Sequence, residues 1–314
     1  MRKAPLVSVF ALLLFLAVIA GALVLQHRAE RIELPKTVTL YMEQRGEILP
    51  LKFDELICGS VFAVMSPKSD SKALEAAACA ASSSALYLMQ HKTPLQYLGA
   101  DLSDSALAYL PPEEVEALYG ASAERYRKKV EEAVKRGTAY AVCFDGEPIY
   151  APVCEISSGK TDCSEDILGK ALPCLLPAEM EADASAFGYQ STAELAPEQI
   201  YKALSGHFPK AFLSPEAETW FCDPVYSESG TLLEISYGGQ KVTGAELKEL
   251  LGLRSAAITL EYGEERWLFT CRGCGDNLGM SLYTANEMAK QGKTAAEILL
   301  HAYPGSALKE TAPE

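Results

Sequence analysis

The chain has 314 residues, of which 49% are hydrophobic and 22% are charged. This is enough for a sizeable hydrophobic core in one large domain or two small ones. The formal net charge of -14 argues against a nucleic-acid partner, because proteins that bind phosphate backbones present a basic face. A carbohydrate ligand stays compatible with this charge, since sugars are bound through aromatic rings and hydrogen bonds.

The first 30 residues form a segment of their own. Basic residues flank an uninterrupted apolar run over residues 5–25. About 21 apolar residues, at about 1.5 Å per residue, span a bilayer core as a helix. A cleaved signal peptide is the alternative, with Ala20-Gly21-Ala22 as its cleavage site, but the apolar run is long for such a signal. We expect a cytoplasmic stub and single-pass anchor over residues 1–30, and an extracytoplasmic domain over residues 31–314.

The rest of the chain predicts hairpins and helices without regular βαβ repetition. This pattern indicates an α+β fold, with a mixed or antiparallel sheet and packed helices. An alanine-rich helix over residues 71–89 is expected to lie buried at the centre, because its small side chains let other backbones approach. The other expected helices cover residues 54–63, 112–120, 121–136, 196–204, 243–251, 280–291 and 294–301. The expected strands cover residues 37–41, 48–51, 138–143, 148–153, 225–237, 258–262 and 267–271. The remainder of residues 175–214 is expected to be loop.

A glycine-spaced loop precedes the first of the two C-terminal helices. Gly273, Gly275 and Gly279 mark positions where the backbone approaches a neighbour closely or takes a positive φ. Such a loop ahead of a helix is able to hold an anion on the helix N-terminus. The alternative, which the spacing alone favours, is a tight turn that only packs.

The stretch 271–305 resembles the C-terminal signature of the SpoIID/LytB family of peptidoglycan-cleaving proteins, also called the stage II sporulation protein D family. That signature reads roughly GRGxGHGVGMSQYGA, followed by MAxxGxxYxxILxHYYPG. The matching residues are Arg272, Gly273, Gly275, Gly279, Met280, Ser281, Tyr283, Ala285, Met288, Ala289, Gly292, Ile298, Leu299, His301, Tyr303, Pro304 and Gly305. Asp276 and Asn277 stand where the family has a histidine and a glycine.

Residues 53–90 resemble the first signature of the same family without a gap. The matching residues are Glu55, Gly59, Val61, Ala63, Met65, Ala73, Leu74, Ala76, Ala78, Ala80, Ala81, Ala85 and Leu86. The resemblance implies a glutamate that acts as acid and then base in cleaving glycan without hydrolysis, and its position is taken by Val64. The family's glutamine, arginine and tyrosine are replaced by Ala77, Ser82 and Ser84. We interpret these losses as an abandoned active site, which only a relocated acid such as Glu55 or Asp276 would rescue.

Residues 154–161 resemble a third family motif, whose histidine serves a zinc site in some members. Cys154 takes the histidine position, while Gly159 and Thr161 are retained. Because thiolates bind zinc, Cys154, Cys163 and Cys174 are weak candidates for a metal site of unusual spacing, and no other cofactor is expected.

The count of 9 cysteines is high for this length. An odd number in an exported chain suggests disulfides and at least one free thiol. The candidate disulfides are Cys154–Cys163 and Cys271–Cys274. The alternatives are buried thiols that pack as small hydrophobes and, for the C-x-x-C pair, a redox or metal role.

The resemblance covers residues 38–305 and leaves three functions open. The first is a membrane-anchored sporulation protein that acts on or binds peptidoglycan glycan strands during forespore engulfment and is catalytically degenerate. The second is an active lytic transglycosylase on peptide-stripped glycan, and the third is a thiol- or metal-dependent role. Stage II sporulation proteins P and M are implied as further partners. The candidate groove residues are Met65, Ser82, Ser157, Ser158, Gly159, Thr161, Arg272, Gly275, Gly279, Met280, Ser281 and Tyr283.

Overall fold

The computed structural model describes residues 31–92 and 96–313. The expected anchor at residues 1–30 lies outside this part of the chain. Among the described residues, no helix combines the length and the apolar character needed to cross a membrane. The described part has an α+β fold with mixed sheets and several packed helices, which confirms the predicted fold class.

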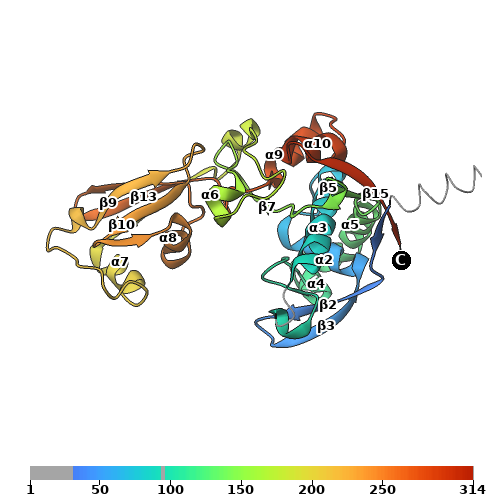
Figure 1. The fold of residues 1–314 in the computed structure, drawn as a ribbon, viewed down its shortest axis with the longest axis horizontal. Coiled ribbons are helices and arrows are strands. Elements are labelled where there is room, and N and C mark those ends of the chain that lie inside the picture. Colours follow the sequence, from blue (N-terminus) through green and yellow to red (C-terminus); the bar gives the residue numbers. More distant parts are fainter. Residues whose placement is uncertain (1–30, 93–95, 314) are drawn as a thin grey trace, which may run out of the picture.

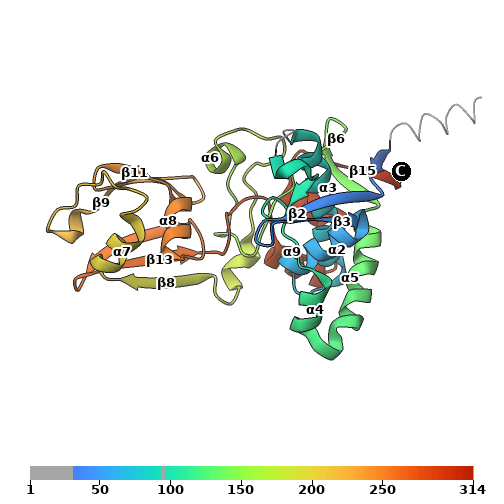
Figure 2. The same cartoon turned by 90° about the horizontal axis from the view of Figure 1, so that it is seen from below.

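The molecule is elongated and has two lobes (Figure 1), each with its own hydrophobic core. The segment around α6 (Ser164–Leu168) lies between the lobes, as Figure 2 also shows. The helices of the large lobe are α2 (Phe53–Val64), α3 (Ser71–His91), η1 (Gln96–Gly99), α4 (Pro112–Tyr119), η2 (Gly120–Ser122), α5 (Ala123–Gly137), α9 (Leu282–Lys290) and α10 (Ala295–Ala302). The small lobe contains α7 (Pro197–Leu204), η4 (Ala217–Thr219) and α8 (Gly244–Leu251).

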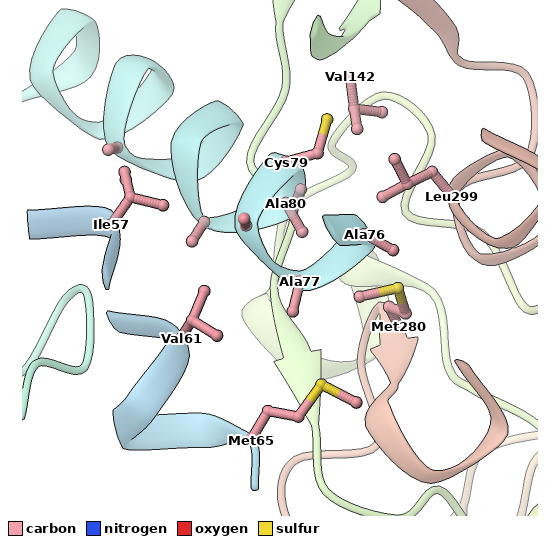
Figure 3. Packing of buried hydrophobic residues seen from close by; sticks show 14 of the residues in the cluster. Ile57, Val61, Met65, Ala76, Ala77, Cys79, Ala80, Val142, Met280 and Leu299 are labelled. Atoms are coloured by element: carbon pink, nitrogen blue, oxygen red, sulfur yellow. The ribbon is translucent and has the colours of Figure 1, made fainter. Parts of the chain in front are cut away.

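Helix α3 is the centre of the large lobe, and it packs against α2, α5, α9 and α10. Its alanines are buried because the neighbouring helices approach it closely, as the sequence predicted. Figure 3 shows Val61 of α2 and Met65, which follows the end of α2, together with Met280 around the alanines of α3. Two sheets complete this lobe. Their strand orders are β1 (Ile32–Leu34), β15 (Ala307–Pro313), β5 (Tyr140–Phe144), β6 (Glu147–Pro148), and β3 (Glu47–Lys52), β2 (Thr37–Met42), β4 (Leu102–Ser103).

The small lobe has two three-stranded antiparallel sheets and a core rich in aromatic rings. Their orders are β12 (Ile258–Gly263), β13 (Arg266–Arg272), β8 (Gln190–Leu195), and β11 (Gln240–Val242), β10 (Leu232–Tyr237), β9 (Phe221–Tyr226). Helix α8 begins with the capping box that its sequence predicts. The Thr243 hydroxyl accepts a hydrogen bond from the Glu246 amide at 3.1 Å, and the Thr243 amide donates to the Glu246 carboxylate at 2.8 Å.

Several strands of the structure differ from the prediction or were not predicted. The strand expected over residues 148–153 is instead β6 and the separate β7 (Val153–Cys154), because β7 leaves the hairpin to pair with β14 (Met280–Ser281). The loop expected over much of residues 175–214 contains β8, whose QSTAEL sequence has little of the apolar character of a strand. Strand β15 follows the last predicted helix and is held by β5 and β1, which are distant in sequence.

Candidate functional site

Two of the family-like segments meet at the junction between the lobes. Strand β7 pairs in parallel with β14. Single β-bridges join Ile156 to Cys274 and Asp162 to Leu278. The folded chain therefore brings the candidate residues near position 157 together with those near position 280, although more than 100 residues separate them.

The glycine loop is a tight, closely packed turn. Gly273, Gly275 and Gly279 all have positive φ, as predicted, at 79°, 109° and 76°. A Cβ atom at Gly279 would lie 2.0 Å from the carbonyl oxygen of Pro152. A Cβ atom at Gly273 would lie 2.6 Å from that of Ile156. The glycines are thus explained by contact with the segment around β7.

Asn277 links three segments through its side chain. Its Oδ1 accepts a hydrogen bond from the Ser158 amide at 2.8 Å. Its Nδ2 lies 2.7 Å from Oδ2 of Asp162, 3.0 Å from the Lys160 carbonyl oxygen and 3.2 Å from Oγ1 of Thr231. Thr231, which precedes β10 in the small lobe, also donates to Asp162. Asn277 is buried and has a φ of 56°. Its hydrogen bonds connect the small lobe to the segment at the junction, so its role is structural.

A buried carboxylate occupies the start of α9. Asp183, in the short helix η3 (Glu181–Ser185), is fully buried. Its Oδ1 accepts hydrogen bonds from the hydroxyls of Ser281 at 2.7 Å and Thr284 at 2.8 Å, and its Oδ2 accepts one from the Ser157 amide at 2.7 Å. The sequence left open an anion at this helix N-terminus, and a side chain of the chain itself lies there. Sequence reasoning missed Asp183, because it lies in a loop-like stretch without a motif.

Comparison with known proteins places this junction in context. No family model matches the chain. The sequence is 25% identical over 281 residues to stage II sporulation protein D of Bacillus subtilis, a match that covers 88% of this chain and 80% of that protein. The same shares and identity hold for stage II sporulation protein D of Bacillus amyloliquefaciens. The chain is therefore similar in sequence to stage II sporulation protein D over most of its length.

Val64 stands where the family resemblance implies an acid, and its surroundings are apolar. Val64 is the last residue of α2 and is half-buried against the large core. Met65, which follows it, is 6% exposed. Ser84 accepts a hydrogen bond from the Ala151 amide at 3.0 Å. The hydroxyl of Ser82 is buried without a hydrogen-bond partner among the described residues.

Glu55 and Asp276, the two acids considered as substitutes, both have other partners. Glu55 lies in the first turn of α2, where its carboxylate accepts a hydrogen bond from the Lys52 amide at 3.1 Å. Nine helical residues separate it from Val64, which is about 13 Å along the axis. Asp276 points into solvent and forms an ion pair with Lys248 of α8. Asp70, the carboxylate nearest to Val64 in sequence, caps α3 by accepting from the Lys72 amide at 2.8 Å.

Most of the candidate groove residues are buried. Partial exposure is found at Gly159, Arg272, Gly275 and Tyr283. The others are buried: Met65, Ser82, Ser157, Ser158, Thr161, Gly279, Met280 and Ser281. Few of the candidate groove residues are therefore accessible to a ligand from solvent.

The predicted disulfides are not formed, since all nine cysteines, each of which lies in the described residues, are free thiols. Cys271 faces the aromatic core of the small lobe, whereas the thiol of Cys274 donates to the Glu155 carboxylate at 3.1 Å. Cys154 is buried on β7, and Cys163 is half-exposed just ahead of α6. Both proposed pairs thus combine thiols in different environments.

The thiols also do not fit a zinc ion. Within residues 31–92 and 96–313, no group of three or more His, Cys, Asp or Glu side chains is arranged to hold a metal, so Cys154, Cys163 and Cys174 form no such site. Burial raises the pKa of the Cys154 thiol strongly, and the charges of Asp183 and Asp276 raise it further. A protonated thiol is a poor ligand, because zinc binds the thiolate.

Proposed function

We propose that this chain is a sporulation protein of the cell wall that binds peptidoglycan glycan strands during forespore engulfment without cleaving them. The similarity to stage II sporulation protein D supports the link to sporulation. The observation that carries the proposed loss of activity is Val64, a half-buried apolar residue at the position of the acid.

Glycan cleavage needs a carboxylic acid that gives a proton to the leaving oxygen. The carboxylates around the junction already have other partners. Asp183 accepts three hydrogen bonds, Asp276 is paired with Lys248, and Asp70 caps α3. Removing the acid lowers transition-state stabilisation but leaves contacts that bind the ground state. Binding of glycan is therefore compatible with the loss of catalysis.

The proposal includes membrane attachment through residues 5–25, whose uninterrupted apolar sequence is long enough to span a bilayer. The protein would then present its two lobes to the cell wall outside the membrane. Stage II sporulation proteins P and M are proposed as neighbours in the engulfment machinery, on the strength of the family resemblance alone.

The test is an assay of product release with the full chain in mild detergent. Peptide-stripped glycan strands are incubated with the protein, and 1,6-anhydro sugar ends are measured by mass spectrometry beside a known lytic transglycosylase. We expect no product above the buffer control, together with sedimentation of the protein with insoluble glycan. Protein that stays in the supernatant, as it does in a control without glycan, would overturn the binding proposal.

The active alternative has its own outcome in the same assay. Glu55→Gln and Asp276→Asn variants are run in parallel, with Glu124→Gln on α5 as a matched control. Anhydro ends that appear with the native chain and disappear in one of the first two variants would establish a relocated acid. Product that survives thiol alkylation and chelation would also exclude the thiol- or metal-dependent alternative.

A further inference from the structure

A large groove lies in the small lobe, away from the junction, and has a volume of about 1020 Å³. Its walls come from α7, the loop that leads into η4, and the turn between β12 and β13. Figure 1 shows α7 at the end of the molecule opposite the large lobe. None of the family-like motifs contributes to this lining.

Three aromatic rings line the groove. Tyr201 on α7 is 55% exposed. The indole of Trp220 is held in place by a hydrogen bond from Nε1 to the Ser214 carbonyl oxygen at 2.8 Å. The ring of Tyr262 packs edge-on against Trp267, with 5.3 Å between the ring centroids. Fixed, partly exposed rings provide flat apolar surfaces at little cost in conformational entropy.

The rim of the groove is strongly acidic, and its charges are not neutralised. The lining contains Glu198, Glu216, Glu218, Glu264 and Glu265 against one basic residue, Arg266. Within the described part of the chain, none of these five glutamates forms an ion pair. Glutamates on a solvated rim are ionised at neutral pH, so the groove presents negative charge to solvent.

A second groove in the same molecule is also lined by acidic residues, but most of these form ion pairs within the chain. It has about 960 Å³ and lies between β3, α2, α4 and α5. There, Glu113 pairs with Arg45 at 3.0 Å, Glu116 with Arg127 at 2.9 Å and Glu55 with Lys52 at 3.4 Å. The other two acids of its lining, Asp54 and Glu131, form no ion pair among the described residues. Three of the five acids of that groove are thus paired within the chain, whereas all five glutamates of the small-lobe groove are free to pair with a cationic ligand.

We propose that the small-lobe groove is a second glycan-binding site, which takes β-1,4-linked aminosugars that carry free amino groups. The apolar face of a sugar ring packs on an aromatic ring, and the protonated amine lies between a carboxylate and a ring face. An N-acetylated sugar brings no charge to the same place. The inference rests on the proposed function, in that it assumes a glycan rather than a basic peptide as the ligand.

The experiment measures binding of a glucosamine hexamer to the full chain in mild detergent, at about pH 6, where glutamates are ionised. The chain has 2 tryptophans, and Trp267 is 4% exposed, so a change in fluorescence on binding reports Trp220. We expect the N-acetylated hexamer to bind about tenfold more weakly, and the affinity for the free-amine hexamer to fall as salt rises.

Two variants locate the site. Glu218→Gln/Glu264→Gln should weaken hexamer binding about tenfold, and Tyr201→Ala about fivefold. Glu124→Gln/Glu132→Gln on α5 removes the same charge and should leave binding unchanged. Equal binding of the two hexamers, or equal binding by all variants, would overturn the proposal. Tighter binding of an oligo-lysine peptide at the same groove would overturn it in favour of a protein partner.

The outcome is separable from that of the proposed function. Failure of the hexamer to bind, while the native chain still sediments with peptide-stripped glycan, refutes only the second site. Hexamer binding that survives while sedimentation is lost refutes the role of the junction and leaves the small-lobe groove as a sugar site.

Discussion

Residues 53–90 and residues 271–281 resemble the same family, but they depart from its pattern in different ways. The first region has apolar side chains at positions where the family has polar ones, and the second has a polar side chain where the family has a glycine. In the first region, an acid and an amide are replaced by Val64 and Ala77, which pack against the large core. In the second region, a glycine is replaced by Asn277, whose side chain ties Ser158, Asp162 and Thr231 together. In this chain, Val64 and Ala77 of the first region therefore pack in the core of the large lobe, whereas Asn277 of the second region holds the two lobes together through hydrogen bonds.

The largest expected effect is the loss of stability when Gly279, at the junction between the lobes, is replaced. The Gly279→Ala variant should lose about 4 kcal/mol of unfolding free energy, because its Cβ meets the Pro152 carbonyl oxygen and its φ of 76° strains an alanine. Gly292→Ala is the matched control, since Gly292 has a φ of 89° and an added Cβ would find only open space within 4 Å. That control should lose about 1 kcal/mol in urea unfolding. Equal losses would contradict the close approach at the junction.

The next effect concerns the network of Asn277. Asn277→Ala should cost about 3 kcal/mol, since it leaves the buried Ser158 amide without its acceptor and removes one of the two side-chain hydrogen bonds to Oδ2 of Asp162. Asn277→Gly loses the same bonds but relieves the positive φ, so it should regain about 1 kcal/mol in the same urea measurement. A cost below about 1 kcal/mol for the alanine variant would show that the hydrogen bonds of Asn277 contribute little to stability.

A smaller effect is expected at Val64. Val64→Glu should cost about 1 kcal/mol, because a carboxylate replaces a half-buried apolar side chain. It should release no anhydro ends from peptide-stripped glycan, because Ala77, Ser82 and Ser84 still lack the family's polar groups. Recovery of activity by this one substitution would break the comparison, since it would mean that the rest of the first region had stayed competent.

The smallest effect concerns the rates at which the cysteine thiols react with a labelling reagent, which involves no change in the sequence. Burial raises the pKa of Cys58 and Cys79 to about 12, so both thiols are protonated at neutral pH and gain reactivity only as the pH rises toward that value. With iodoacetamide at about pH 8, they should react more than about a thousandfold more slowly than an ordinary exposed thiol. Exposed Cys222 should be labelled first, and denaturation without a reductant should release nine thiols. Fewer than nine would reinstate a disulfide.

Much of the local structure could be predicted from the sequence because it depends on neighbouring residues. The alanine-rich run specifies a buried helix, Thr243 and Glu246 specify a helix start, and the spacing of Gly273 and Gly279 specifies a turn with positive φ. These signals act over a few residues, so no knowledge of the rest of the fold is needed to interpret them.

Tertiary structure alone decided which residues meet at the candidate site. Strand β15 exists because β5 and β1 lie on either side of it, and Asp183 matters because Ser157, Ser281 and Thr284 surround it. The two candidate disulfides are not formed in the structure, where the paired thiols face different surroundings. The acidic groove of the small lobe likewise joins α7 to a hairpin more than 50 residues away. Contacts over such separations depend on how the chain packs, and no local pattern in the sequence encodes them.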